Sequence, residues 1–253
     1  MNTRFRTQDI VVIGICAALY AAFGILTANF SFLGIGFLPA VVIPAIFAVL
    51  YGPWVGGISG ALGIFIRDMF VHGIPLLSLS AGVPPNFILF FLIGYIAHRN
   101  ISLKQAMAGI IISAVALLLP AVILLPDLSL LTGLSAEWFL LAFVLTVILS
   151  LSIIAVAAVR WKEWRSYAIA AVIGQAAGAG LLSVTVWAVS PYFLSYFVSG
   201  PVSATFVLPI FVWTFATELP FILLVGPPVI KACYRAFPSL SRKENRGINI
   251  EKS

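Results

Sequence analysis

Apolar residues occur in long runs along this chain, separated by short polar breaks. The runs lack the period-2 alternation of barrel strands, and a membrane interior offers the backbone no hydrogen-bond partners, so they predict spanning helices. A helix needs about 20 apolar residues to cross the hydrocarbon layer. The expected spans are residues 9–29, 37–52, 54–71, 84–98, 105–125, 137–159, 167–189 and 204–232. The second and fourth are short, so tilt or partial burial is expected for them.

Composition supports the same fold class. Hydrophobic residues make up 62% of the 253 residues, charged residues 9%, and the mean hydropathy is +1.15. A soluble domain carries roughly a quarter charged residues, so this chain has too few charges to cover a water-exposed surface. The sequence predicts an all-α integral membrane protein, a polytopic helical bundle of about eight transmembrane helices. We expect a multi-pass location in the cell membrane.

Basic residues are distributed asymmetrically between the two expected sides of the membrane. With alternating spans, all Lys and Arg residues except Arg67 fall on one side, in segments 4–6, 99–104, 160–165 and 231–252. The positive-inside rule then places both termini in the cytoplasm. It also explains the formal charge of +6 without a nucleic-acid partner.

Cysteine and histidine usage argues against metal, redox and protease chemistry. Cys16 and Cys233 lie far apart, without paired spacing or a histidine nearby, so no disulfide, metal site or cofactor is predicted. The string Gly57–Gly60 (GISG) resembles the motif of intramembrane serine proteases. However, His72 lies 13 residues after Ser59 on the same expected helix, roughly 20 Å away. With no other enzyme motif present, an intramembrane enzyme is the least favoured function.

Small residues recur at helical spacing in several spans. In the first span Ala17 and Ala21, and beside them Gly14, Ala18 and Ala22, form a stripe that allows close approach of another helix. The approaching helix can belong to this chain or to a partner. Further stripes run through the third and seventh spans and predict packing seams within the chain; they comprise Gly52, Gly56, Gly57, Gly60, Gly63, Gly174 and Gly178.

Three stretches resemble the substrate-binding S components of energy-coupling factor (ECF) transporters. They are the first span with its A-x-x-x-A pattern, PAVVIPAIFAVLYGPWVGGISGALGIFIRDM followed after a polar loop by NFILFFLIGYIAHR, and the last span, ELPFILLVGPPVIKACYRAFP. The resemblance implies a subunit that binds a vitamin or similar micronutrient on the outer side. Its implied partners are a transmembrane coupling (T) subunit and two ABC-type ATPases, with Ala17, Ala18, Ala21 and Ala22 as the residues that dock the coupling subunit.

The chain departs from that family in its number of spans. The family usually has six, so we interpret residues 105–159 as an inserted helical hairpin between core segments 1–98 and 166–238. Residues 1–238 are thus expected to form one transmembrane domain. The polar stretch 239–253 is predicted to be a disordered cytoplasmic tail.

Polar residues within spans are costly in lipid and are candidate binding residues. The expected substrate contacts are Arg67, Asp68, Asn86, Glu218 and, in an outer loop, Asn29. Arg67 has alternatives: a pair with Asp68, a pair with Glu218, or contact with an anionic ligand. Asn86 can instead cap the fourth helix, and Asn29 can belong to an ordinary interfacial belt.

Glu218 is the most informative of these residues. It lies near the middle of the last span, and Pro220 leaves the carbonyl of Ala216 without its helical donor. This combination predicts a locally opened helix beside a cavity. The expected function is substrate capture for an ECF-type importer. A stand-alone secondary permease coupled to protons through Glu218 is the alternative.

Overall fold

The computed structural model describes residues 6–105 except 33, residues 164–193, residues 201–240 except 239, and scattered positions between 107 and 159. The spans expected at 105–125 and 137–159 therefore lie outside the continuously described residues. The same is true of nearly all of the predicted tail. The inserted hairpin and the total of eight spans stay predictions.

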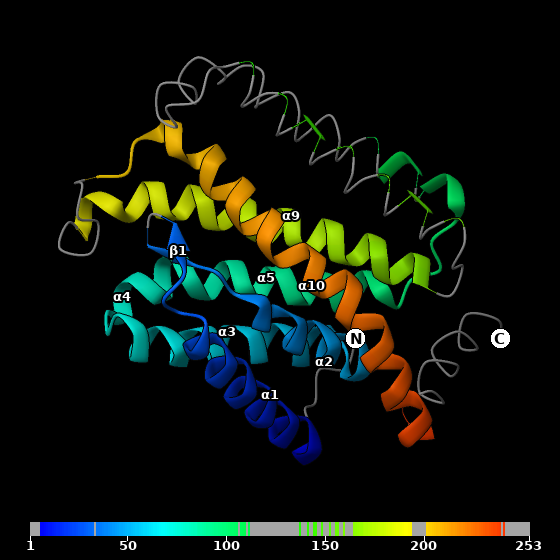
Figure 1. Ribbon diagram of the computed structural model, residues 1–253. Helices are drawn as coiled ribbons and strands as arrows, with labels where there is room; N and C mark the ends of the chain where they lie inside the picture. Colours follow the sequence, from blue (N-terminus) through cyan, green and yellow to red (C-terminus); the bar gives the residue numbers. More distant parts are fainter. Residues whose placement is uncertain are drawn as a thin grey trace.

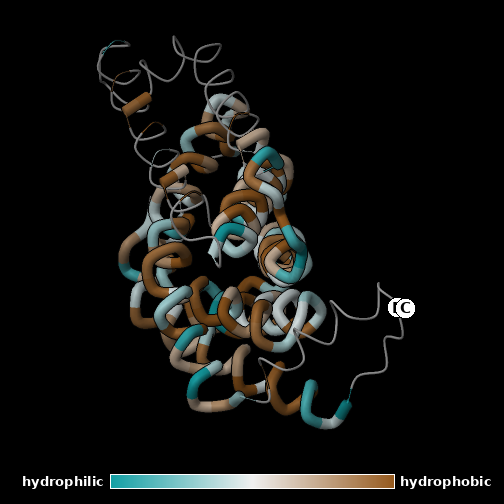
Figure 2. Tube along the Cα trace, turned by 90° about the vertical axis from the view of Figure 1, so that its right-hand side faces the viewer, coloured by the Kyte–Doolittle hydropathy of each residue, from teal (hydrophilic) through white to brown (hydrophobic). Residues whose placement is uncertain are grey.

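The described chain is a bundle of apolar helices, which confirms the predicted helical fold class. Among the described residues, five helical segments are long and apolar enough to cross a membrane: Thr7–Leu26, Pro53–Val71, Pro75–Ala97, Arg165–Tyr192 and Ala204–Ala236. Large apolar side chains such as Phe23, Leu26 and Phe70 are exposed on their outer faces, as lipid-facing positions require. Figure 2 shows that apolar residues dominate these helices.

Three helices form a central layer, and two others cross it. The layer consists of α3 (Pro53–Val71), α5 (Val83–Ala97) and α9 (Arg165–Val189), in which α5 packs against both neighbours. Helix α1 (Thr7–Leu26) packs against α3, and α10 (Val207–Ala236) packs against α9. Both cross the layer obliquely in Figure 1. The start of α1 and the end of α10 lie toward one end of the bundle, and the loop after α1 lies toward the other.

Short elements complete the two ends of the bundle. Strands β1 (Ser31–Phe32) and β2 (Ile35–Gly36) form an antiparallel hairpin, with Ser31 paired to Gly36 and Phe32 to Ile35. A 3-10 turn, η1 (Pro39–Val41), leads from the hairpin into α2. Two further 3-10 turns, η4 (Ser190–Tyr192) and η5 (Ala204–Phe206), follow α9 and precede α10.

Helix α2 (Val42–Tyr51) is shorter than the hydrocarbon layer is thick, as expected for the short second span. Together with η1 it covers Pro39–Tyr51, about 20 Å at 1.5 Å per residue, against a hydrocarbon thickness of about 30 Å. Ala45 and Ala48 are completely buried, so α2 is packed inside the bundle. Gly52, with φ of 103°, makes the turn into α3; this positive φ suits glycine because it has no Cβ.

The fourth span begins earlier than predicted, at Pro75 instead of residue 84. Helix α4 (Pro75–Leu77) and the π-helical turn η2 (Ser78–Gly82) continue directly into α5. The prolines at 84 and 85 suggested a helix start because they lack the N–H of a normal helical turn. The wider π-turn, in which the Val83 N–H bonds to the Ser78 carbonyl, keeps the chain helical up to these prolines.

The local opening predicted near Glu218 is absent from α10. The helix is continuous from Val207 to Ala236 and contains Pro220, Pro227 and Pro228. Proline removes one hydrogen bond but does not by itself unwind a helix whose neighbours hold it in place. The expected local opening was therefore wrong, whereas the expected cavity beside Glu218 is present.

Glycines form the predicted packing seams between helices of this chain. A Cβ at Gly56 would lie 2.7 Å from the Cα of Ala48, and one at Gly174 would lie 2.8 Å from the carbonyl oxygen of Leu89. Gly60 and Gly63 likewise face Phe90 and Tyr20 at distances that exclude a side chain. These contacts confirm the intramolecular role expected for the stripes in the third and seventh spans.

Replacing Gly56 with alanine should lower the free energy of unfolding by about 1–3 kcal/mol, the cost typical of overpacking. The added methyl group meets the backbone of Ala48, which cannot move aside as a flexible side chain could. Unfolding in mixed detergent micelles measures the effect. Gly14→Ala is the matched control because no atom of the described residues lies within 4 Å of its added Cβ. An equal loss of unfolding free energy in both variants would contradict a tight α2–α3 seam.

Candidate functional site

A cavity of about 100 Å³ lies between α3, the π-turn and α5, α9, α10 and the β-hairpin. Arg67, Asp68, Asn86 and Glu218 all line it, so the structure brings together four of the five side chains chosen from sequence. Asn29 is exposed in the turn after α1 and is not among the lining residues. That the four residues bind a substrate stays a prediction.

The β-hairpin closes one side of this cavity. Gly34, Ile35 and Gly36 line it, and the indole Nε1 of Trp213 on α10 donates to the Ile35 carbonyl at 3.1 Å. A Cβ at Gly36 would collide with the guanidinium of Arg67, so the hairpin backbone lies directly against that group. The glycines thus allow a short loop to approach the charged residues closely.

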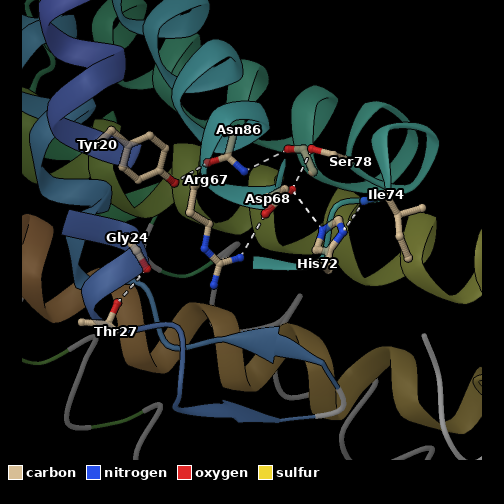
Figure 3. Close-up of polar contacts among 10 residues, drawn as sticks. Tyr20, Gly24, Thr27, Arg67, Asp68, His72, Ile74, Ser78 and Asn86 are labelled. Carbon is tan, nitrogen blue, oxygen red and sulfur yellow. Dashed lines mark hydrogen bonds and ion pairs between the residues drawn. The ribbon is translucent and has the colours of Figure 1, made fainter. Parts of the chain in front are cut away.

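Asp68 is the centre of a polar cluster at the end of α3 (Figure 3). Its Oδ1 accepts a hydrogen bond from Arg67 Nη1 at 3.0 Å, and its Oδ2 accepts one from Ser78 Oγ at 2.7 Å. Arg67 and Asp68 are 8% and 5% exposed. Of the alternatives for Arg67, the structure contains the buried pair with Asp68.

His72 completes the cluster in a neutral form. Its Nδ1 accepts a hydrogen bond from the Ile74 backbone N–H at 3.1 Å, so this nitrogen carries no proton. The proton of the neutral ring is then on Nε2, which lies 3.7 Å from Asp68 Oδ2. His72 was not among the expected substrate contacts, but it lines the cavity.

Asn86 connects α5 to α1 and does not cap a helix. The Tyr20 hydroxyl donates to its Oδ1 at 2.7 Å, and its Nδ2 donates to the Gly82 carbonyl at 2.9 Å. Asn86 cannot cap the fourth span because this span already begins at Pro75, so Asn86 lies within it. Gly82 leaves room here for the carboxylate, since a Cβ at that position would lie 2.7 Å from Asp68 Oδ2.

Glu218 is held by Gln175 across the α9–α10 interface. Gln175 Nε2 donates to Glu218 Oε2 at 2.7 Å and to the Thr214 carbonyl at 3.3 Å. Within the described part of the chain, no ion pair joins Glu218 to Arg67, so the predicted structural pair between them is not formed. Each has a different partner, although both line the same cavity.

Three buried polar atoms have no hydrogen-bond partner among the described residues. They are Arg67 Nε, Gln175 Oε1 and Thr214 Oγ1, and all three residues line the cavity. Buried polar groups are nearly always satisfied, and each unsatisfied one calls for an explanation. Their common location makes this cavity the candidate binding site.

The structure divides the four candidate docking alanines into two faces of α1. Ala17 and Ala21 are buried inside the bundle at 2% and 3% exposure. Ala18 and Ala22 are exposed on the outer face. The two alternatives for the stripe therefore apply to different residues: the first pair packs within the chain, and only the second is accessible to a partner.

Sequence reasoning missed several lining residues for an understandable reason. Gln175 is a polar residue within a span, so the signal that selected Glu218 also applied to it. Ser78 and Thr214 gave no signal, because hydroxyls are common in transmembrane helices and bond to their own backbone. Ser59, the residue of the protease-like motif, is fully buried and donates to the Val55 carbonyl at 2.6 Å.

Comparisons with protein-family models, with curated proteins and with solved structures find no match to this chain.

Proposed function

We propose that this chain is the substrate-capture subunit of an ECF-type importer in the cell membrane. It binds a small micronutrient such as a vitamin on the outer side and delivers it with a transmembrane coupling subunit and two ABC-type ATPases. The observation that carries the proposal is the cavity lined by three buried polar atoms that have no hydrogen-bond partner among the described residues. Pockets for small ligands are mostly apolar with a few convergent polar groups, and this cavity has that character.

The position of the cavity supports capture from outside. It is closed by the β-hairpin, which lies at the end of the bundle opposite the start of α1 and the end of α10 (Figure 1). The basic residues of the chain predict that the latter end is cytoplasmic. A guest would then enter from the outer side, where the hairpin lines the cavity.

The exposed face of α1 is separate from the cavity, which supports different surfaces for the coupling subunit and for the substrate. Ala18 and Ala22 are exposed to lipid, whereas none of the four α1 alanines lines the cavity. A stripe of small residues allows close packing of a partner helix in lipid. Assembly with a coupling subunit can therefore proceed without disturbing the bound substrate.

Reconstituted liposomes test the proposal. Mass spectrometry first identifies the small molecule that co-purifies with the detergent-solubilised chain. Uptake of this molecule should require the coupling subunit and ATP, and should cease with catalytically inactive ATPases. Uptake by the chain alone, driven by a proton gradient and lost in Glu218→Gln, would instead establish the secondary permease.

A further inference from the structure

The charges that line the cavity do not balance. Arg67 and Asp68 compensate each other through their ion pair, and His72 is neutral because its Nδ1 is a hydrogen-bond acceptor. Glu218 remains, 5% exposed, with no ion-pair partner among the described residues. Glu218 is thus the one acidic side chain of the described lining without a cation beside it, and its charged form is costly to bury unless a counter-charge is supplied.

Hydrogen-bond acceptors gather around this carboxylate. A carboxylate only accepts hydrogen bonds, so the Gln175 amide must present its Nε2 to Glu218 and its Oε1 elsewhere. Gln175 is completely buried, and its Oε1 has no partner among the described residues. Thr214 Oγ1, also without a partner there, lies one helical turn before Glu218 and can accept or donate.

We propose that the cavity binds a small organic cation whose N–H groups donate to Glu218, Gln175 Oε1 and Thr214 Oγ1. An amidinium, a guanidinium or a protonated amino-substituted ring has this chemistry. The ligand supplies the missing positive charge and satisfies two of the three unpartnered atoms. This inference rests on the proposed function, because it names the substrate class of the same cavity.

The opposite side of the cavity restricts the ligand further. Arg67 uses Nη1 for Asp68, and its Nε–H is an unpartnered buried donor. The ligand therefore carries an acceptor, such as a ring nitrogen or an oxygen, away from its cationic end. Leu77, Ala81 and Leu89 also line the space and provide apolar contact for the body of a ring.

An anionic ligand fits the same residues poorly. Arg67 is already neutralised by Asp68 at 3.0 Å, so it offers no free positive charge. The charged form of Glu218 would also repel an anion within an environment of low dielectric constant. A buried arginine alone would suggest an anionic ligand, and a buried glutamate alone a cationic one. Because Arg67 is paired and Glu218 is not, the charges favour the cation.

Three isosteric probes test the charge preference on the purified full-length chain, without coupling subunit or ATPases. Benzamidine, benzamide and benzoate share a ring and differ in charge and in N–H groups; acetamidine, acetamide and acetate repeat the series at smaller size. Ligand-induced thermal stabilisation and calorimetry should rank the amidine at least about tenfold tighter than the amide, since a charged hydrogen bond exceeds a neutral one by such a factor. Benzoate or acetate binding best, or no amidine binding in either series, overturns the proposal.

Substitutions at Glu218 and Thr214 test whether these two side chains contact the amidine. Glu218→Gln should weaken amidine binding about 10- to 100-fold and bring it close to that of the amide. Thr214→Val should weaken it by about three- to tenfold. Thr217→Val is the matched control, because the Thr217 hydroxyl donates to the Trp213 carbonyl at 2.6 Å and Thr217 does not line the cavity. Unchanged amidine affinity in folded Glu218→Gln also overturns the proposal.

The two proposals can fail separately. If the amidine series binds as expected but uptake needs no ATPases, the ligand class holds and the capture-subunit function fails. If uptake depends on the ATPases but the chain prefers the anionic probes, the function holds and the ligand class fails. The probe series on the unmodified chain decides the ligand class even if Glu218→Gln does not fold.

Discussion

Replacing Asp68 with alanine should lower the free energy of unfolding by about 3–5 kcal/mol, because it leaves the Arg67 guanidinium buried without its counter-charge. Asp68 accepts hydrogen bonds from Arg67 and from Ser78, so one substitution removes both interactions. The surrounding helices exclude water, since Arg67 is only 8% exposed. Unfolding in mixed micelles, monitored by circular dichroism, measures the loss.

Two further variants separate the buried pair from a general effect of removing a carboxylate. Asp9→Ala removes a carboxylate at the exposed start of α1, where Asp9 accepts from the Arg6 backbone N–H at 2.9 Å; it should cost only about 1 kcal/mol, as loss of a cap does. The double variant Arg67→Met with Asp68→Ala should recover most of the loss, because no guanidinium is then left buried without its counter-charge. A double variant as unstable as Asp68→Ala would show that the ion pair is not the cause.

Replacing Ala18 with tryptophan should abolish co-purification with the coupling subunit and leave the fold intact. The prediction rests on the proposed function and on the exposure of Ala18 toward lipid. A large side chain there separates the two helices, and packing between membrane helices depends on close approach. Affinity pull-down in detergent measures assembly, and unfolding in mixed micelles checks the fold.

Ala17→Trp is the matched control on the adjacent position of the same helix. Ala17 is 2% exposed, and its carbonyl lies 3.0 Å from a Cβ built at Gly63 on α3. The large side chain cannot fit there, so this variant should lose stability by several kcal/mol, as strong overpacking does. Normal assembly of Ala18→Trp would remove the outer face of α1 from the docking surface.

The helical fold class and four of the lining residues of the cavity could be predicted from the residues alone. Apolar runs of membrane-spanning length left helices as the choice, because lipid cannot satisfy an open backbone. The scarcity of polar residues in those runs selected Arg67, Asp68, Asn86 and Glu218, since burying such groups in lipid is costly unless they serve a purpose. The same reasoning applies to Gln175, a polar residue within the expected span 167–189 that was not among the chosen candidates.

The hydrogen-bond and ion-pair partners of these polar side chains depend on how the helices pack, so they could not be predicted from the sequence. Arg67 could pair with Asp68 or with Glu218, and spacing along the chain cannot settle this because the choice depends on how α3, α9 and α10 are positioned. In the structure Arg67 donates to Asp68, and Gln175 donates to Glu218. It thereby leaves the carboxylate of Glu218 without a cation among the described residues, a feature that no local pattern encodes.

Helix packing also explains why the alanine stripe of α1 has a buried and an exposed face, and why α5 and α10 differ from the expected helices. Positions 17 and 18 are adjacent in sequence, and burial separates them only once α3 covers one face of α1. Prolines suggested a helix start before Asn86 and an opening after Glu218, because local propensity disfavours proline inside helices. Packing against neighbouring helices and a π-turn overrode that propensity, so α5 is extended toward Pro75 and α10 stays continuous.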